Sequence, residues 1–365
     1  MKRLVITKIL ACSCLVCIIA MVLSGCSLKK PISSKSMNTN QWGVGWNLGN
    51  TLDSVDFKQK GSVEYYETLW GNPVTTKQMI DTVKSAGFGT IRVPVTWYDH
   101  VDENGIIDAD WMDRVGEVVQ YVLDNGLNCI INLHHDTGKV AWIKADVSKK
   151  EEMKQIVQSL WKQIADYFQS YDENLIFEGM NEILNIQNQW DGASDEELNM
   201  VNEMNQVFVN TIRESGKKNA ERLLIVNTYA ASTDKKVLDA FSMPKDIIAD
   251  HLIAEVHFYG HDEDSIDAML ERLDKKFVQN EIPVIIGECG MENKPEEGKT
   301  REKRLEYAQY LITKAKEKGI ACFWWDNGGK FKNSEEVNNF ALLNRQQCEW
   351  YDKELVDTII KSSKT

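Results

Sequence analysis

The chain has 365 residues and an excess of acidic side chains that gives it a formal net charge of −13. This charge argues against a nucleic acid or an anionic surface as partner, and it is compatible with a neutral polymer. On length alone two domains are possible, but one barrel of alternating strands and helices also fills such a span.

The N-terminus has the pattern of a secretion signal. Basic residues at positions 2, 3 and 8 precede an almost wholly apolar run from Ile9 to Leu23, which is short for a permanent membrane span. The run leads into Leu23-Ser24-Gly25-Cys26, which resembles the lipobox of bacterial lipoproteins. We therefore predict a signal peptide over residues 1–25, lipid on Cys26, a polar tether over 26–40 and a folded body over 41–365.

Loss of the three leader cations would take the net charge from −13 to −16, which is −13 minus 3. The alternative is an ordinary secretion signal in which Cys26 is incidental. Both alternatives predict an extracytoplasmic bacterial protein, either lipid-anchored at the cell surface or secreted, whose only membrane contact is the anchor.

Four cysteines lie in the predicted body: Cys129, Cys289, Cys322 and Cys348. Their spacings of 160, 33 and 26 residues do not resemble a zinc motif, and a chain of this length does not need disulfide staples. We predict buried free thiols, with a bridge between Cys322 and Cys348 as the alternative.

Short apolar runs alternate with amphipathic helical patterns along the body. The predicted strands are Gly43 to Leu48, Thr90 to Pro94, Asn128 to Leu133, Leu175 to Gly179, Arg222 to Val226, Ile253 to His257, Pro283 to Gly287 and Ala321 to Trp325. The predicted helices are Thr75 to Ala86, Asp110 to Asn125, Lys149 to Phe168, Asp195 to Ser215, Asp264 to Val278 and Lys303 to Lys318. Thr75 is expected to cap the first of these helices. Glycines at positions 87, 126, 216 and 319 are expected to end four of the predicted helices.

Near-continuous apolar strands joined by helices indicate a parallel sheet that is buried on both faces. Eight such units predict a single (β/α)8 TIM barrel. An open doubly wound sheet is the alternative, and it is disfavoured because no glycine-rich phosphate loop follows the first strand.

In a barrel of this kind, active sites collect at the C-terminal ends of the strands. Polar groups gather at those positions: Arg92, His134, His135, Asp136, Asn181, Glu182, His257, Tyr259, Glu288, Asp326 and Asn327. Glu182 and Glu288 follow the fourth and seventh strands and would face each other across the barrel mouth. Two carboxyl groups about 5 Å apart are what a retaining glycosidase requires.

The neighbours of the two carboxylates suggest their roles. Asn181 can bond a sugar 2-hydroxyl, which places Glu182 beside the glycosidic oxygen as acid/base. Arg92 and Tyr259 can donate to Glu288 and hold it ionised as the nucleophile.

Three further residues are expected to support this chemistry. His257 would tune Glu182, and His134 would bind a hydroxyl near the cleavage point. Of two adjacent tryptophans in the last strand, Trp325 is predicted to face the sugar as an apolar platform, while Trp324 packs outward against helices, because neighbours in a strand face opposite ways.

A family resemblance rests on these segments in this order. They are Trp46 to Thr51, Ile91 to Val95, Asn132 to Asp136, Phe177 to Glu182, Val256 to Tyr259, Ile286 to Gly290 and Trp325 to Asn327. Between about Trp42 and Trp350 the chain resembles glycoside hydrolase family 5 of clan A, closest to the endoglucanase-rich fourth subfamily. The resemblance implies a (β/α)8 barrel, a retaining double displacement without metal or organic cofactor, and a cleavage subsite lined by Arg92, His134, Asn181, His257, Tyr259 and Trp325.

Two departures from the family pattern concern the leaving-group side. Ile183 stands where the family usually has proline after the acid/base glutamate, and the connection Gly260 to Asp264 is short. They leave open whether cellulose, mixed-linkage glucan, xyloglucan or mannan is the preferred substrate.

Aromatic residues of the predicted loops complete the expected site. Trp70 and His135, with Asn47, are the candidates for the glycone side, and Trp142 and Trp190 are placed on the rim. Trp111 and Trp161 lie inside helical patterns and are expected in the core.

The favoured prediction is an endo-acting β-1,4-glucanase whose partner is a β-linked polysaccharide. The alternatives are an endo-β-1,4-mannanase, a transglycosylase that uses the same residues, and an inactive polysaccharide-binding lipoprotein. The presence of both glutamates together with Arg92 and Tyr259 disfavours the last of these.

Overall fold

Eight strands form a closed parallel barrel in the computed structural model, which describes residues 42–58, 61–329 and 340–364. The strands are β1 (Gly45–Leu48), β2 (Thr90–Val93), β3 (Asn128–Asn132), β4 (Leu175–Glu178), β5 (Leu224–Asn227), β6 (Leu252–Phe258), β7 (Val284–Cys289) and β8 (Ala321–Asp326). They pair in chain order, and β8 returns to β1 with Asn47 opposite Trp325. The predicted (β/α)8 barrel is confirmed, with each predicted strand within two residues of its observed bounds.

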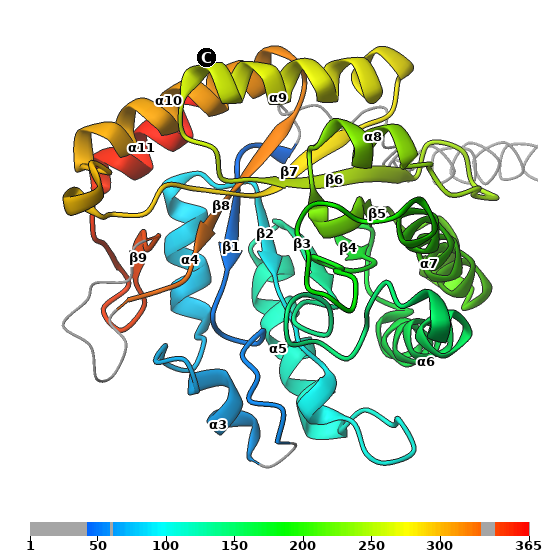
Figure 1. Cartoon of the computed structure of the whole chain (residues 1–365). Helices are drawn as coiled ribbons and strands as arrows, with labels where there is room; N and C mark the ends of the chain where they lie inside the picture. The colour runs from blue at the N-terminus through cyan, green and yellow to red at the C-terminus, as the bar shows by residue number, and fades with distance from the viewer. Residues whose placement is uncertain (1–41, 59–60, 330–339, 365) are drawn as a thin grey trace, which may run out of the picture. The chain divides into compact units, whose positions relative to one another are not determined.

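Helices surround the strands (Figure 1). They are α3 (Val63–Thr68), α4 (Lys77–Ala86), α5 (Ala109–Asp124), α6 (Lys150–Phe168), α7 (Asp195–Glu214), α8 (Lys235–Ala240), α9 (Glu263–Lys276), α10 (Arg301–Glu317) and α11 (Lys353–Ser362). A two-stranded antiparallel pair, β9 (Leu343–Asn344) and β10 (Glu349–Trp350), precedes α11. Within the described ranges, no helix is both long and apolar enough to cross a membrane.

Capping groups fix where the helices begin and end. The expected cap of α4 was wrong by one residue: the side chain of Thr76, not Thr75, accepts from the backbone N–H of Met79. Gly87 ends that helix in the left-handed conformation at φ 110°, which glycine adopts without a steric penalty. Ser194 and Glu197 form a reciprocal capping box at the start of α7, which satisfies two backbone donors that would otherwise lack partners.

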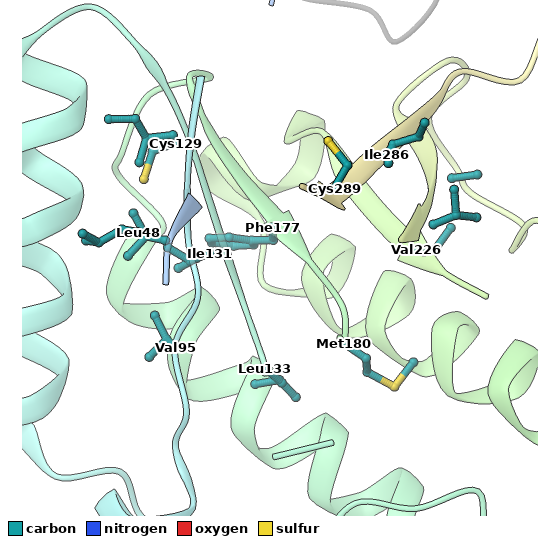
Figure 2. Close-up of a cluster of buried hydrophobic side chains, with 14 of the residues drawn as sticks. Leu48, Val95, Cys129, Ile131, Leu133, Phe177, Met180, Val226, Ile286 and Cys289 are labelled. Carbon is teal, nitrogen blue, oxygen red and sulfur yellow. The ribbon is translucent and has the colours of Figure 1, made fainter. Parts of the chain in front are cut away.

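The main hydrophobic core lies between the strands and the helices. Figure 2 shows part of it, with Leu48, Ile131, Phe177, Val226 and Ile286 drawn from five strands. Trp111 of α5 and Trp161 of α6 are fully buried in the same core, as predicted. Because successive side chains of a strand alternate between its faces, the residues next to these point to the barrel interior.

The four cysteines of the barrel are free thiols. Cys129, Cys289 and Cys322 are buried as predicted, whereas Cys348 is half-buried because it lies in the turn between β9 and β10. The alternative bridge between Cys322 and Cys348 is therefore wrong. Residues 1–41, which hold the predicted signal peptide, Cys26 and the whole tether, lie outside the described residues.

Candidate active site

Polar side chains occupy the inward positions at the C-terminal ends of the barrel strands. Strand alternation places one on each of the first six strands, and all of them are buried: Asn47, Arg92, Asn132, Glu178, Asn227 and Glu255. Glu178 and Glu255 were not among the predicted site residues. Each buried charge in such a layer requires a partner, because an isolated ion in the interior costs several kcal/mol or more.

Arg92 supplies the central cation of this layer. Its guanidinium binds Glu178 through two hydrogen bonds of 2.7 Å, from Nε to Oε2 and from Nη2 to Oε1. The remaining donors reach Glu288 Oε1 at 2.7 Å, Asn181 Oδ1 at 2.8 Å and Asn47 Oδ1 at 3.0 Å. The planar fork of arginine suits such a multiply bonded buried site, which a lysine could not satisfy.

Glu288 near the end of β7 accepts hydrogen bonds from two sides. Arg92 donates to Oε1, and the hydroxyl of Tyr259 donates to Oε2 at 2.8 Å. His134 Nε2 lies 4.0 Å from Oε1. The bonds from Arg92 and Tyr259 thus fix both oxygens of a carboxylate that is only 6% exposed.

Glu182 lies in the loop after β4 and is the more accessible of the two carboxylates, with 21% of its side chain exposed. Its Oε1 lies 2.8 Å from Nδ1 of His257. One oxygen of Glu182, one of Glu288 and a ring nitrogen of His257 all lie within 4.8 Å of one another. The approach of these two oxygens agrees better with the roughly 5 to 5.5 Å between the carboxyl groups of retaining glycosidases than with the roughly 6.5 to 9.5 Å of inverting ones.

The surrounding charges change the titration of two buried groups. Burial lowers the pKa of His257, but the attraction of Glu288, Glu182 and Glu255 outweighs it and raises that pKa to about 10. Burial raises the pKa of Glu178 to about 7 against the attraction of Arg92. At neutral pH His257 is therefore an imidazolium.

Aromatic and histidine rings line the neighbouring part of the barrel mouth. Trp325 is half-buried and lies parallel to the ring of His134, with centroids 5.6 Å apart and planes at 6°. The buried Trp324 instead packs against Tyr307 of α10. On the same side as His134, His135 contacts the ring of Trp70 at 5.2 Å.

Three other predicted residues, Asn47, Trp142 and Trp190, differ in how far they are exposed. Asn47 is fully buried, and its amide donates to the backbone carbonyls of Gly287 and Trp324. Asn47 therefore supports the polar layer, and the expected glycone contact is wrong because no sugar could reach it. Trp190 is 49% exposed on the rim, whereas Trp142 is half-buried and donates to Asp136.

Potential ligand atoms of Asp53, His134 and His135 also come within 4.8 Å of one another. Asp53 already accepts from the backbone N–H groups of Asn50 and Thr51, and Nδ1 of His134 lies 3.1 Å from the Asn132 amide nitrogen. These bonds orient the side chains of Asp53 and His134 at the mouth of the barrel. A reaction without cofactor stays a prediction for this site.

A family profile described as "Cellulase (glycosyl hydrolase family 5)" matches residues 54–331. The chain belongs to glycosyl hydrolase family 5. It is 36% identical over 354 residues to endoglucanase A of Clostridium longisporum, a match that covers 91% of this chain and 66% of the relative. The chain thus spans about two thirds of that relative's length.

Solved structures of the family resemble the whole barrel. A broad-specificity GH5-4 endoglucanase from Ruminococcus champanellensis with bound cellotriose superposes with a TM-score of 0.84 at 36% identity, covering 92% of this chain and all of that one. A family 5 enzyme of Prevotella bryantii, in complex with a xyloglucan tetradecasaccharide, has a TM-score of 0.82 at 34% identity, covering 91% and 99% of the two chains. These similarities place the family 5 chain in the fourth subfamily, as the sequence motifs predicted.

Proposed function

We propose that this family 5 protein is an endo-β-1,4-glucanase that cleaves glucan chains with retention of configuration. In this proposal Glu182 is the acid/base and Glu288 is the nucleophile. The observation that carries it is a pair of carboxylates at the mouth of the barrel, with one oxygen of each within 4.8 Å of the other.

In the first step, Glu288 attacks the anomeric carbon while Glu182 gives its proton to the glycosidic oxygen. The bond to the leaving sugar breaks, and a glycosyl ester of Glu288 forms. The bonds from Arg92 and Tyr259 support the role of Glu288, because they hold an ionised oxygen in place before the attack. Asn181 is held by Arg92 through its Oδ1, so its amide nitrogen is the group that can serve the sugar 2-hydroxyl.

In the second step, water enters on the side of the departed sugar. Glu182, now a carboxylate, takes a proton from this water, whose oxygen attacks the anomeric carbon and displaces Glu288. Two inversions give net retention, and both glutamates return to their starting protonation states. The greater exposure of Glu182 supports this role, since water and leaving group must both reach it.

The half-buried face of Trp325 supports a pyranose as the ring bound next to the cleavage point, because an indole offers an apolar surface to the sugar face. His134, parallel to that indole, can bind a hydroxyl of the same sugar. The relatives include proteins with bound cellotriose and xyloglucan oligosaccharide. We therefore expect β-1,4-glucans, including branched ones, as substrates.

A panel assay tests this function. Purified protein lacking residues 1–25 is incubated with carboxymethyl cellulose, lichenan, xyloglucan, glucomannan and mannan, and reducing ends and viscosity are measured together. We expect release from the glucans, with viscosity falling early because chains are cut internally. Failure to release reducing ends from any β-glucan would refute the proposal, and a preference for mannan would favour the mannanase alternative.

A separate incubation with cellohexaose, followed by product sizing, addresses transfer of the glycosyl group to a second sugar. An oligosaccharide longer than the one supplied would appear if a sugar hydroxyl replaced water in the second step. Hydrolysis predicts only shorter products from cellohexaose at low concentration.

We also propose that the protein is held at the outside of a bacterial cell by lipid on Cys26. The support is the apolar leader that ends in Leu-Ser-Gly before this cysteine. Expression of the whole chain with labelled fatty acid tests the proposal. Incorporation that is lost in Cys26→Ala is expected, while an unlabelled protein in the medium would favour the ordinary secretion signal.

A further inference from the structure

His257 has a carboxylate on each side of its imidazole ring. Nδ1 lies 2.8 Å from Glu182 Oε1 and 3.5 Å from Glu288 Oε2, whereas Nε2 lies 3.5 Å from Oε1 of Glu255. Within the described part of the chain, Nε2 of His257 and Oε1 of Glu255 are both buried and have no hydrogen-bond partner. The two atoms face each other at 3.5 Å, the outer limit of a hydrogen bond. The positive charge of a protonated imidazole and the negative charge of the carboxylate would balance each other there.

Glu255 is held in this position by its neighbours on both sides. It lies two residues before His257 on β6, so both side chains point to the barrel interior. A Cβ atom on Gly287 would lie only 1.5 Å from Glu255 Oε1, so the carboxylate fills space that only a glycine leaves open. The amide of Asn227 donates to Oε2 at 2.5 Å. The carboxylate is therefore fixed and fully buried.

The charged and titratable groups packed around His257 and its carboxylate partners come from five strands or their adjoining loops. They are Arg92 from β2, His134 after β3, Glu178 and Glu182 at the end of β4, Glu255 and Tyr259 at β6, and Glu288 on β7. Arg92 Nε lies 3.6 Å from Glu255 Oε1, but the hydrogen bonds of its guanidinium go to other residues, among them the carboxylates of Glu178 and Glu288. Arg92 and His257 thus both lower the pKa of Glu255 against the effect of its burial.

We propose that Glu255 is a positioning residue of the active site, the buried counter-ion that keeps His257 doubly protonated. This inference rests on the proposed role of Glu182. A doubly protonated His257 donates its Nδ1–H to Glu182 Oε1 throughout the cycle. Because Oε1 is then occupied as an acceptor, the catalytic proton resides on Oε2, the oxygen free to face the glycosidic bond and later the attacking water.

A purely structural role is the rival explanation. Glu255 binds Asn227, whose Oδ1 accepts from the backbone N–H of Met180 at 3.3 Å and so supports the segment before Glu182. Asn227→Ala breaks this link and keeps the carboxylate, whereas Glu255→Gln keeps the shape of the side chain and removes its charge. The two variants therefore form a matched pair.

Histidine titration by NMR separates the two explanations without any measurement of activity. The chain has six histidines, and the signals of His257 are assigned in ¹⁵N-histidine-labelled protein by their loss in His257→Gln. We expect an imidazolium that persists to a pH near 10 in the wild type and in Asn227→Ala. In Glu255→Gln its midpoint should fall by about one pH unit or more, because the counter-ion is gone.

An unchanged midpoint in Glu255→Gln would overturn the proposal, as would a neutral His257 at pH 7 in the wild type. A midpoint lowered equally by Asn227→Ala would assign Glu255 a structural role instead. If Glu255→Gln does not fold, Glu255→Asp serves instead: it keeps the charge but draws it away from Nε2 of His257, so the midpoint should fall below that of the wild type, and an unchanged midpoint would overturn the proposal.

The kinetic test uses two cellobiosides, one with a good and one with a poor leaving group. Glu255→Gln should lower kcat/KM on the poor leaving group by about tenfold, a part of the roughly 100- to 10,000-fold that a general acid contributes. The loss on the good leaving group should be smaller, because that reaction needs little protonation. Asn227→Ala should affect both substrates alike, and equal losses in Glu255→Gln would contradict the positioning role.

Failure of the proposed function can be distinguished from failure of the Glu255 proposal. If Glu182→Ala lost equal activity on both substrates, the acid/base assignment would fail, whatever His257 did. The titration of His257 would still report whether Glu255 is its counter-ion.

Discussion

Arg92 offers the most quantitative test of the buried polar layer. Its guanidinium is fully buried and makes two bonds of 2.7 Å to Glu178, whose carboxylate is also fully buried. Arg92→Met removes the cation and leaves Glu178 and Glu288 without it, which should lower the free energy of unfolding by about 3 to 5 kcal/mol. This is a large part of the roughly 5 to 15 kcal/mol that holds an ordinary domain folded.

The partner variant Glu178→Gln should cost less, about 1 to 3 kcal/mol, because Arg92 keeps Glu288 and the new amide still offers an oxygen. The double variant removes both members of the pair. Its cost should be smaller than the sum of the two single costs by about 2 kcal/mol, within the range found for residues in one buried network. Guanidinium unfolding at pH 7.5, followed by tryptophan fluorescence, measures all four proteins.

The pH dependence of the unfolding free energy provides a second test of the pair formed by Arg92 and Glu178. Burial raises the pKa of Glu178 to about 7 even beside Arg92, and loss of Arg92 would raise it further. The pKa of Glu178 in the folded protein then lies above its pKa in the unfolded chain. The Arg92→Met variant therefore gains stability as the pH falls and Glu178 takes up a proton. The penalty of Arg92→Met should thus shrink between pH 8 and pH 5.5. Costs that add within about 0.5 kcal/mol, or a penalty that does not change with pH, would refute this reasoning.

Three further predictions concern other parts of the barrel. Glu182→Ala should lose far less activity on substrates with good leaving groups than on cellohexaose, and equal losses would contradict an acid role. Gly287→Ala should lower both the activity and the free energy of unfolding, because the new methyl group would collide with Glu255. The expected loss of unfolding free energy is about 1 to 3 kcal/mol. A variant with wild-type melting and turnover would show that Glu255 does not require the space beside Gly287. Burial lowers the pKa of His100 to about 3, so its neutral form contributes stability that is present above about pH 6.5 and lost as the pH falls toward 3. Urea unfolding at pH 7.5 and 4.5 measures this effect. The free energy of unfolding of His100→Phe relative to the wild type should be higher at pH 4.5 than at pH 7.5, and a difference that does not change with pH would contradict the prediction.

The barrel could be predicted because its strands carry a strong signal. Strands of a parallel sheet that is covered on both faces appear as short, mostly apolar runs between helical patterns. The six-residue helices α3 and α8 are too short to show a helical period. The missed helix α11 does have that pattern, with Leu355, Val356 and Ile359 on one face after the capping Asp352.

The site was predictable only where its residues lie at the strand ends. Glu178 and Glu255 were missed because they lie within apolar runs, where a carboxylate is easily taken for a solvent-facing residue. The signal that could have identified Glu255 is alternation, because it lies two residues before His257 on the same strand. Glu178 had no such signal, because Glu182 lies in the loop beyond the end of its strand. Asn47 was assigned to the sugar because the sequence does not show that the bonds of Arg92, Gly287 and Trp324 use its whole amide.

The central claim is that Glu182 and Glu288 act as acid/base and nucleophile of a retaining reaction, and trapping of the covalent intermediate tests it most directly. The protein is incubated with a 2-deoxy-2-fluoro-β-cellobioside that carries a good leaving group, digested, and mapped by mass spectrometry. One glycosyl adduct is expected, on the peptide that contains Glu288 and on its carboxylate. An adduct on Glu182 or on any other residue would contradict it.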